Sequence, residues 1–248
     1  MNVENADLFQ ASSEEDFSLL NGPFSQKRYD ETTSEEKIDI ISGHFRAIME
    51  TLGLDLSDPS LMKTPERVAK MYVHEIFSGL HPKAFPSISM FPAPADGSHH
   101  TGFLITKTSF ISFCEHHFVP MIGTAYIAYI PNNTVIGLSK ISRIVRYFSS
   151  RPQLQERLTD QISRALQKLF KHENLAILIE AEHLCVLARG VKDEDSTTTT
   201  LRLCGTFKND SSLQQQFFEL VKIKKTEKET STSPLNSFLT HSSETWSQ

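Results

Sequence analysis

The fold of this 248-residue chain can be inferred from the residues Phe103-Leu-Ile-Thr-Lys-Thr-Ser-Phe-Ile-Ser-Phe113, which are followed directly by Cys114-Glu-His-His117. The β-branched and aromatic residues of its first part recur with a period of two, which is typical of a strand. The same composition predicts three further strands, over Gly123–Ile130, Asn174–Ala181 and Thr197–Phe207. Turn residues between some of these stretches favour a mostly antiparallel sheet.

Helical periodicity precedes and interrupts the strands. Thr33 and Glu36 predict a capping box at the start of a first helix, which Gly53 terminates. Thr64, as the N-cap before Pro65, predicts the start of a second helix. Three more helices are expected over Ile141–Ser149, Leu154–Phe170 and about 211–222. Helices that precede and interrupt an antiparallel sheet indicate an α+β fold.

The composition is that of an ordinary globular protein. Lys and Arg total 25 against 30 Asp and Glu, and 39% of the residues are hydrophobic, which excludes collagen-like, fully disordered and coiled-coil chains. No apolar run approaches the ~18 residues of a membrane helix. The start of the chain is acidic, unlike a secretory signal, and three widely spaced cysteines do not suggest a disulfide framework. We therefore expect a cytoplasmic protein.

Charge divides the chain into three parts. Residues 1–36 hold nine acidic and two basic side chains, which leaves a balance of +2 for the remainder. The absence of a sustained apolar period predicts a flexible acidic arm over residues 1–32. Residues 33–223 are expected to form one catalytic domain, and the polar, Ser/Thr-rich residues 224–248 a disordered tail.

Two sequence patterns suggest a metal site. Cys114 and His117 stand three positions apart at the end of a predicted strand, and His183-Leu-Cys185 follows another. If extended geometry continues there, His183 and Cys185 face the same side. Cys114, His117 and Cys185 form a donor set that suits zinc, and three ligands leave a fourth position for water, as in catalytic sites. A closed structural site would instead recruit Cys204 or a second histidine, although we expect Cys204 in the core.

Other polar residues near these patterns are candidates for catalysis and substrate binding. A histidine is often only structural, but His116 and His183 adjoin the metal ligands, which favours proton transfer. Glu156, with Gln155 beside it, lies at the start of a helix. Its carboxylate is either stabilised there by the helix dipole or accepts two hydrogen bonds from the edge of a purine. Ser139 and the basic residues Lys140, Arg143 and Arg189 form either a solvated charged face or a binding site for a polyphosphate.

Six motifs together resemble one family, GTP cyclohydrolase I. They occur in order and in register over about 34–222: Thr64-Pro-Glu-Arg-Val-Ala-Lys-Met-Tyr72, Cys114-Glu-His-His117, Val135-Ile-Gly-Leu-Ser-Lys140, Gln153-Leu-Gln-Glu-Arg157, His183-Leu-Cys185 and Ala188-Arg-Gly190. The sequence departs only mildly from the family pattern: bulky residues stand within Thr199–Gly205, where the family has smaller residues.

The resemblance implies a fold, a reaction and an assembly. The fold is the tunnelling fold (T-fold), with an antiparallel sheet, N-terminal helices and helices packed on one face of the sheet. The reaction is zinc-dependent hydrolysis of GTP at carbon 8 of guanine, with release of formate and rearrangement to 7,8-dihydroneopterin triphosphate, the first step of tetrahydrofolate and pterin biosynthesis. The assembly is a homodecamer with active sites between subunits, and neither nucleic acid nor membrane is an expected partner.

The resemblance also implies roles for residues. Cys114, His117 and Cys185 match the zinc ligands, and His116 and His183 match the histidines that transfer protons. The matched substrate-binding positions are Glu156 and Gln155 for guanine, Ser139, Lys140, Arg143 and Arg189 for ribose and triphosphate, and Arg67 and Lys70 for phosphate contacts from a neighbouring subunit.

Three alternatives remain open on the sequence. A T-fold relative acting on another purine nucleotide or a pterin would share the motifs. A regulatory member would bind GTP without converting it. A zinc-stapled nucleic-acid-binding module is disfavoured by the net charge of −5 and by the lack of repeated finger-like ligand pairs.

Overall fold

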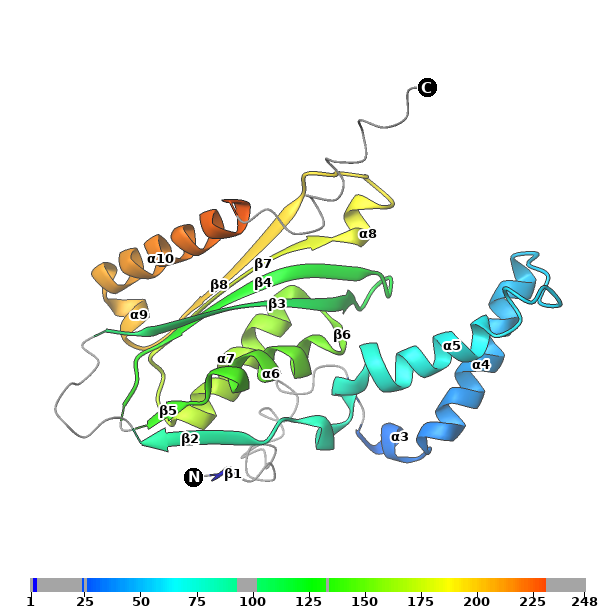
Figure 1. Ribbon diagram of the computed structural model, residues 1–248, viewed down its shortest axis with the longest axis horizontal. Coiled ribbons are helices and arrows are strands. Elements are labelled where there is room, and N and C mark those ends of the chain that lie inside the picture. The colour runs from blue at the N-terminus through cyan, green and yellow to red at the C-terminus, as the bar shows by residue number, and fades with distance from the viewer. Residues whose placement is uncertain (1, 4–23, 25, 93–101, 133, 231–248) are drawn as a thin grey trace, which may run out of the picture.

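The structure is a computed structural model that describes residues 2–3, 24, 26–92, 102–132 and 134–230. Its centre is a five-stranded sheet in the order β6-β3-β4-β7-β8 (Figure 1). The strands are β3 (Leu104–Cys114), β4 (Pro120–Tyr129), β6 (Pro152–Gln153), β7 (Leu175–His183) and β8 (Thr197–Leu203). All pairings are antiparallel except that of β3 with β6. The predicted α+β class and antiparallel sheet are therefore confirmed.

A second, three-stranded sheet lies beside the first. It has the order β1-β2-β5 and consists of β1 (Asn2–Val3), β2 (Ile88–Pro92) and β5 (Thr134–Ile136). Its strands are antiparallel, and Ile88 and Ile136 contribute buried side chains to the main core. The sequence pattern did not predict these short strands.

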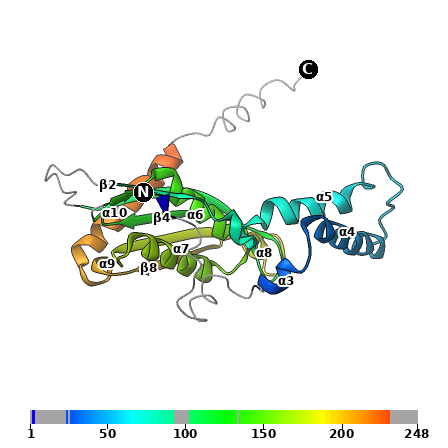
Figure 2. The ribbon, with the colours of Figure 1, turned by 90° about the horizontal axis from the view of Figure 1, so that it is seen from below.

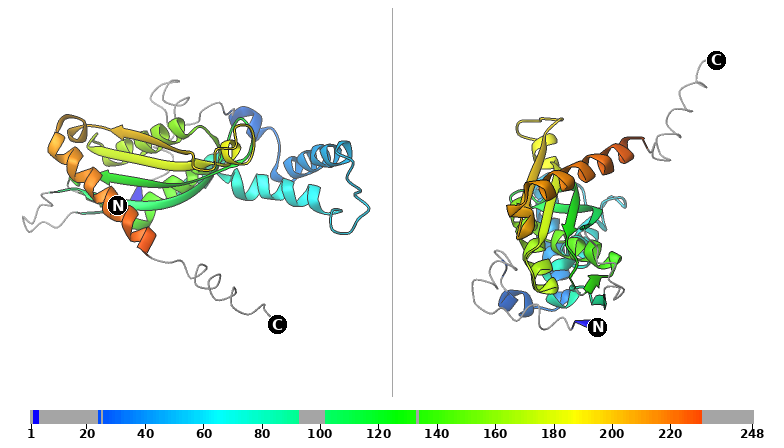
Figure 3. Two further views of the ribbon diagram at one scale, coloured as in Figure 1. Left: turned by 90° about the horizontal axis from the view of Figure 1, so that it is seen from above. Right: turned by 90° about the vertical axis from the view of Figure 1, so that its left-hand side faces the viewer.

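Helices cover both faces of the large sheet, so the expectation that helices pack on one face was wrong (Figures 1 and 3). One face carries α6 (Leu138–Ser149) and α7 (Gln155–Phe170), and the other carries α9 (Thr206–Asn209) and α10 (Ser211–Thr230). The reason is visible in β4, where Ile127 joins the first core while its neighbours Tyr126 and Ala128 join the second. Both faces of the strand are apolar, so each must be shielded from water by packed helices.

The N-terminal helices form a hairpin that projects beyond one end of the sheet (Figures 1 and 2). They are α3 (Gln26–Asp30), α4 (Ser34–Thr51) and α5 (Thr64–Met71), after which the chain continues as a π-helical turn over Tyr72–Ile76 and 3₁₀ turns over Ser78–Leu80 and Pro82–Ala84. The predicted capping box of Thr33 and Glu36 is confirmed. The N-cap of α5 is Lys63, not Thr64, which is already helical.

The expected arm and tail fall largely outside the described residues. Residues 4–23, 25 and 231–248 belong to this group, so the flexibility of the arm and the disorder of the tail stay predictions. Where the chain is described, α10 continues to Thr230, past its expected end near residue 222. Among the described residues, no helix combines the length and the apolar character needed to cross a bilayer.

Candidate functional site

The first half of the site is the tight turn between β3 and β4. Cys114 ends β3, and its backbone N–H donates to the carbonyl of Val119 at 2.9 Å, while Phe118 N–H donates to the Cys114 carbonyl at 2.8 Å. Glu115 N–H donates to the carbonyl of Gln153 in the neighbouring β6 at 3.1 Å. Phe118 adopts a positive φ of 54°, which is uncommon for a bulky residue and closes the turn. These bonds hold Cys114 at a defined place.

Aromatic rings attach this turn to the N-terminal helices. The ring of Phe118 packs edge-on against Phe77, with centroids 5.2 Å apart, and lies 6.4 Å from Tyr72. Phe77 also contacts Phe113, the residue before Cys114, at 5.7 Å. The segment that follows α5 therefore packs directly on the turn that carries the candidate ligands.

The second half of the site begins where β7 ends at His183. The chain then forms a short helix, α8 (Leu184–Leu187), in which the Ala188 N–H donates to the Leu184 carbonyl at 2.8 Å. The condition under which His183 and Cys185 would face the same side, extended geometry through Cys185, is therefore not met. A helical residue turns by about 100° relative to its predecessor, so Cys185 is presented by this helical turn and not by strand alternation.

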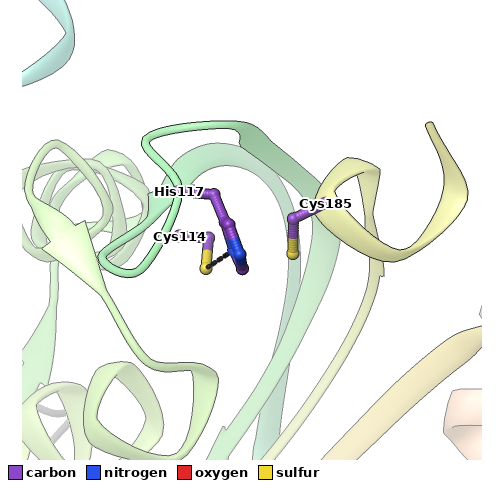
Figure 4. A group of neighbouring side chains, drawn as sticks. All are labelled: Cys114, His117 and Cys185. Atoms are coloured by element: carbon purple, nitrogen blue, oxygen red, sulfur yellow. Dashed lines mark hydrogen bonds between the residues drawn. The ribbon is translucent and has the colours of Figure 1, made fainter. Parts of the chain in front are cut away.

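Cys114, His117 and Cys185 nevertheless converge (Figure 4). Their ligand atoms all lie within 4.8 Å of one another, and Cys114 Sγ is 3.9 Å from His117 Nδ1. Sulfur and nitrogen bound to one tetrahedral zinc ion are roughly 3.6 Å apart, given the usual Zn–S and Zn–N lengths. The donor types and their spacing thus fit a zinc ion.

The electrostatics of the cysteines also fit a cation. Burial raises the pKa of the Cys185 thiol, the neighbouring Cys114 raises it further, and the positive charge of Arg189 opposes the effect. Two adjacent sulfurs cannot both ionise easily without compensation, whereas a coordinated divalent ion deprotonates thiols outright. This group can hold a metal ion.

Cys204 does not take part in this group. It follows β8, is 9% exposed, and its sulfur lies 3.8 Å from Ser163 Oγ of α7. Among the described residues, the metal-capable group therefore contains three ligands, the number found in catalytic zinc sites.

His183 lies beside the group, with Glu156 near it. Burial lowers the pKa of His183, and the carboxylate of Glu156 partly opposes this shift, so the neutral imidazole is favoured near pH 7. Glu156 itself is exposed in the first turn of α7. Gln155, expected to accompany Glu156 in binding guanine, is instead buried, and its Oε1 lies 2.8 Å from His183 Nε2.

His116 is exposed on the turn and borders a cavity of about 370 Å³. Glu115, Phe118, Gln153 and Arg157 are among the other lining residues, whereas Cys114, His117 and Cys185 are not. Gln153 Oε1 is buried and has no hydrogen-bond partner among the described residues. The structure thus places His116 next to the ligands in the chain but facing a different space from them.

Among the basic residues, the structure brings Arg189 to the ligands. Its Nη1 lies 2.7 Å from His117 Nε2. Arg189 follows α8 directly and is exposed, so its remaining donors face solvent next to the candidate metal group.

The other basic residues lie elsewhere in the same chain. Ser139 and Lys140 are in the first turn of α6, whereas the far end of α6 leads to β6, which pairs with Cys114. Twelve helical residues span about 18 Å, so the two ends are well separated. Arg67 and Lys70 are exposed on α5, where Lys70 forms an ion pair with Glu66. One chain therefore does not unite the predicted anion-binding residues.

An ion pair that the sequence did not predict supports the turn. Arg157 of α7 forms a two-pronged ion pair with Glu115, in which Nη2 lies 3.2 Å from Oε1. The residues are 42 positions apart, and charge alone gives no reason to pair them. Glu115 lies between Cys114 and His116, so this pair orients the ligand-bearing turn.

Replacing Arg157 by methionine is expected to lower the affinity for zinc by about 10- to 100-fold, the usual effect of losing a residue that orients ligands. Competition with a chromogenic chelator measures this affinity. Arg202→Met is the matched control, because it removes an exposed ion pair, with Asp160 of the same helix as Arg157, that does not involve the turn. Equal affinities in the two variants would contradict the orienting role.

Comparisons with known proteins agree with this arrangement. The sequence model of the family described as GTP cyclohydrolase I matches residues 41–222. The chain is similar to GTP cyclohydrolase 1 of Enterobacter sp. (strain 638), with 50% identity over 194 residues, or 77% of this chain and 86% of that protein. It is 51% identical to GTP cyclohydrolase 1 of Aeromonas salmonicida (strain A449) over 183 residues, or 74% of this chain and 83% of that protein.

A third relative gives the same result. GTP cyclohydrolase 1 of Salmonella arizonae is 48% identical over 195 residues, which cover 78% of this chain and 86% of that protein. The match includes the turn after β3, the start of α7 and α8, so it contains every segment that builds the site. The resemblance seen in the motifs is confirmed, and the chain belongs to the GTP cyclohydrolase I family of enzymes.

Proposed function

We propose that the chain converts GTP and water to 7,8-dihydroneopterin triphosphate and formate, using a zinc ion held by Cys114, His117 and Cys185 in a T-fold. The observation that carries the proposal is the convergence of these three donors, within 4.8 Å of one another, from segments far apart in the sequence. The family membership agrees with it.

The chain's own residues would handle the protons of ring opening. A zinc ion in this group supplies Lewis acidity that makes water nucleophilic near neutral pH. His183, held neutral by burial, would accept a proton and return it to the ring nitrogen that leaves carbon 8. We assign His116 to the second proton transfer because its place in the Cys114–His117 motif matches that role in the family, although within one chain it borders a separate cavity.

Glu156 and Arg189 would hold the substrate in place. The carboxylate of Glu156, exposed near His183, can accept hydrogen bonds from two neighbouring nitrogens of guanine. Arg189 would bind the triphosphate from its position beside His117. Because the triphosphate is remote from carbon 8, its binding energy can serve to orient the reacting atoms.

The remaining candidate anion-binding residues would act across subunits. Ser139, Lys140 and Arg143 lie on α6 and Arg67 and Lys70 on α5, away from the metal group of their own chain. In a homodecamer they would complete the sites of neighbouring copies. In support, the projecting α4–α5 region exposes large hydrophobic side chains, namely those of Ile40, Ile48, Leu52, Leu54 and Met62, as subunit interfaces do.

Incubation with GTP tests the proposal. The zinc-loaded protein is expected to release formate and to give a product that becomes fluorescent as neopterin after oxidation. Both signals should disappear with a strong chelator and return with added zinc. Turnover of dGTP or ATP in place of GTP would favour a relative with another nucleotide substrate, and binding of GTP without formate would indicate a regulatory member.

The place of the product in metabolism stays a prediction, as do a cytoplasmic location and the three-part division of the chain. A role at the start of tetrahydrofolate or pterin biosynthesis follows from the proposed product, because that product already contains the pterin ring.

A further inference from the structure

Gln155 makes an unusually complete set of hydrogen bonds for a residue expected to contact substrate. It is the first residue of α7 and is 2% exposed. Its Nε2 donates to the carbonyl of Ile179 at 3.1 Å and to that of Thr198 at 2.9 Å, and lies 3.3 Å from Thr200 Oγ1. Its Oε1 lies 2.8 Å from His183 Nε2. The side chain thus ties α7 to two strands and to one imidazole.

The partners determine which way the amide faces. Backbone carbonyls only accept hydrogen bonds, so the atom that faces Ile179 and Thr198 must be the NH₂ group. A flipped amide would place its oxygen against two carbonyl oxygens and lose both bonds. Oε1 therefore faces His183, and since that oxygen only accepts, His183 Nε2 must carry a hydrogen.

We propose that Gln155 is a positioning residue: the hydrogen bond from His183 Nε2–H to its Oε1 fixes the orientation and the tautomer of the His183 ring, so that the ring keeps one placement during the reaction. The catalytic part of this inference rests on the proposed function.

The scaffold around Gln155 is built to keep the amide still. Thr159 Oγ1 donates to the Gln155 carbonyl at 2.8 Å and lies 2.7 Å from Thr200 Oγ1. Gln155 and Thr159 are both buried. An amide anchored by two carbonyls and supported by neighbouring hydroxyls cannot rotate without breaking several bonds, so it transmits a fixed orientation to His183.

A spectroscopic test needs no substrate. Solid-state NMR of zinc-loaded protein with ¹⁵N-labelled histidine, with His183 assigned by comparison with His183→Ala, is expected to show a protonated Nε2 and an unprotonated Nδ1. Gln155→Met should instead give a mixture of rings protonated at Nε2 and rings protonated at Nδ1. A protonated Nδ1 in the unmodified protein would overturn the proposal, and this result is independent of whether GTP is turned over.

A double-mutant cycle tests the catalytic consequence. Gln155→Met should lower kcat by about 100-fold, as expected for a misplaced catalytic group, with KM for GTP and zinc content little changed. In the His183→Ala background, the same substitution should change kcat by less than about twofold, because the residue through which it acts is gone. Thr200→Val, which removes one anchor but not the bond to His183, should retain most activity.

Other outcomes separate the rival explanations. Equal losses of kcat in both backgrounds would show a merely structural role, and a large rise in KM with unchanged kcat would show direct contact with GTP. If Gln155→Met fails to fold, Gln155→Leu, which also cannot accept a hydrogen bond from His183, replaces it in the cycle. Failure of the unmodified protein to release formate would refute the proposed function and leave the NMR result to decide on the tautomer.

Discussion

Replacing Cys185 by serine or His117 by alanine is expected to remove bound zinc and to abolish release of formate from GTP. Each change deletes one of three donors that converge within 4.8 Å. Loss of a residue that only orients a ligand usually lowers metal affinity by about 10- to 100-fold. Loss of a ligand itself should therefore lower the affinity by more than about 100-fold. Metal content is measured by atomic emission after dialysis, and activity by formate and by neopterin fluorescence.

Cys204→Ser provides the matched control for these variants. Its sulfur contacts Ser163 in the core and lies outside the metal-capable group. The control should lose some thermal stability, because a polar hydroxyl replaces a buried thiol, but should keep zinc and turnover. Retained turnover in Cys185→Ser, or zinc loss in Cys204→Ser, would mean that the ligands are wrongly assigned.

Replacing His183 by alanine is expected to leave zinc bound while kcat falls by about 10²- to 10⁴-fold, the usual contribution of a general acid–base residue. His183 adjoins the metal group but is not one of its three members. Its half-buried imidazole, whose pKa is lowered by desolvation, is suited to accept a proton near pH 7. Single-turnover rates with GTP, measured beside zinc content, give the two readouts.

His172→Ala is the comparison for this second variant. Burial also lowers the pKa of His172, but its ring stacks on Phe170 at the opposite end of α7 from Gln155. Its removal should affect stability and leave turnover largely intact. Loss of zinc from His183→Ala would instead identify His183 as a ligand and not as a proton carrier.

Sequence patterns predicted the main strands, the longer helices and the three residues of the metal group. Period-two and period-3.6 patterns are local, so they locate β3, β4, β7 and α7 to within a few residues. Cys114 and Cys185 could be recognised as candidate ligands from the sequence, because cysteine thiolates commonly bind zinc. Cys185 converges with its partners even though it lies in a helical turn and not in a strand.

The parts that the sequence did not reveal depend on contacts between distant residues. Arg157 and Glu115 pair across 42 positions, and nothing in either local pattern indicates the partner. The family resemblance matched Gln155, together with Glu156, to guanine binding, but successive helical residues point about 100° apart. One therefore reaches solvent while the other is buried against His183.

The length of α6 restricts how copies of the chain can associate. Under the proposed roles, Ser139 and Lys140 at its beginning serve one pocket, while its end leads to the turn of another. Two copies can join such unlike parts in a two-fold contact, in which each lends its part to the other, or head to tail, in which repetition gives a closed ring or an open filament. In a closed oligomer every subunit both contributes residues to a neighbour's pocket and receives residues from a neighbour, so a dissociated subunit would have no complete pocket.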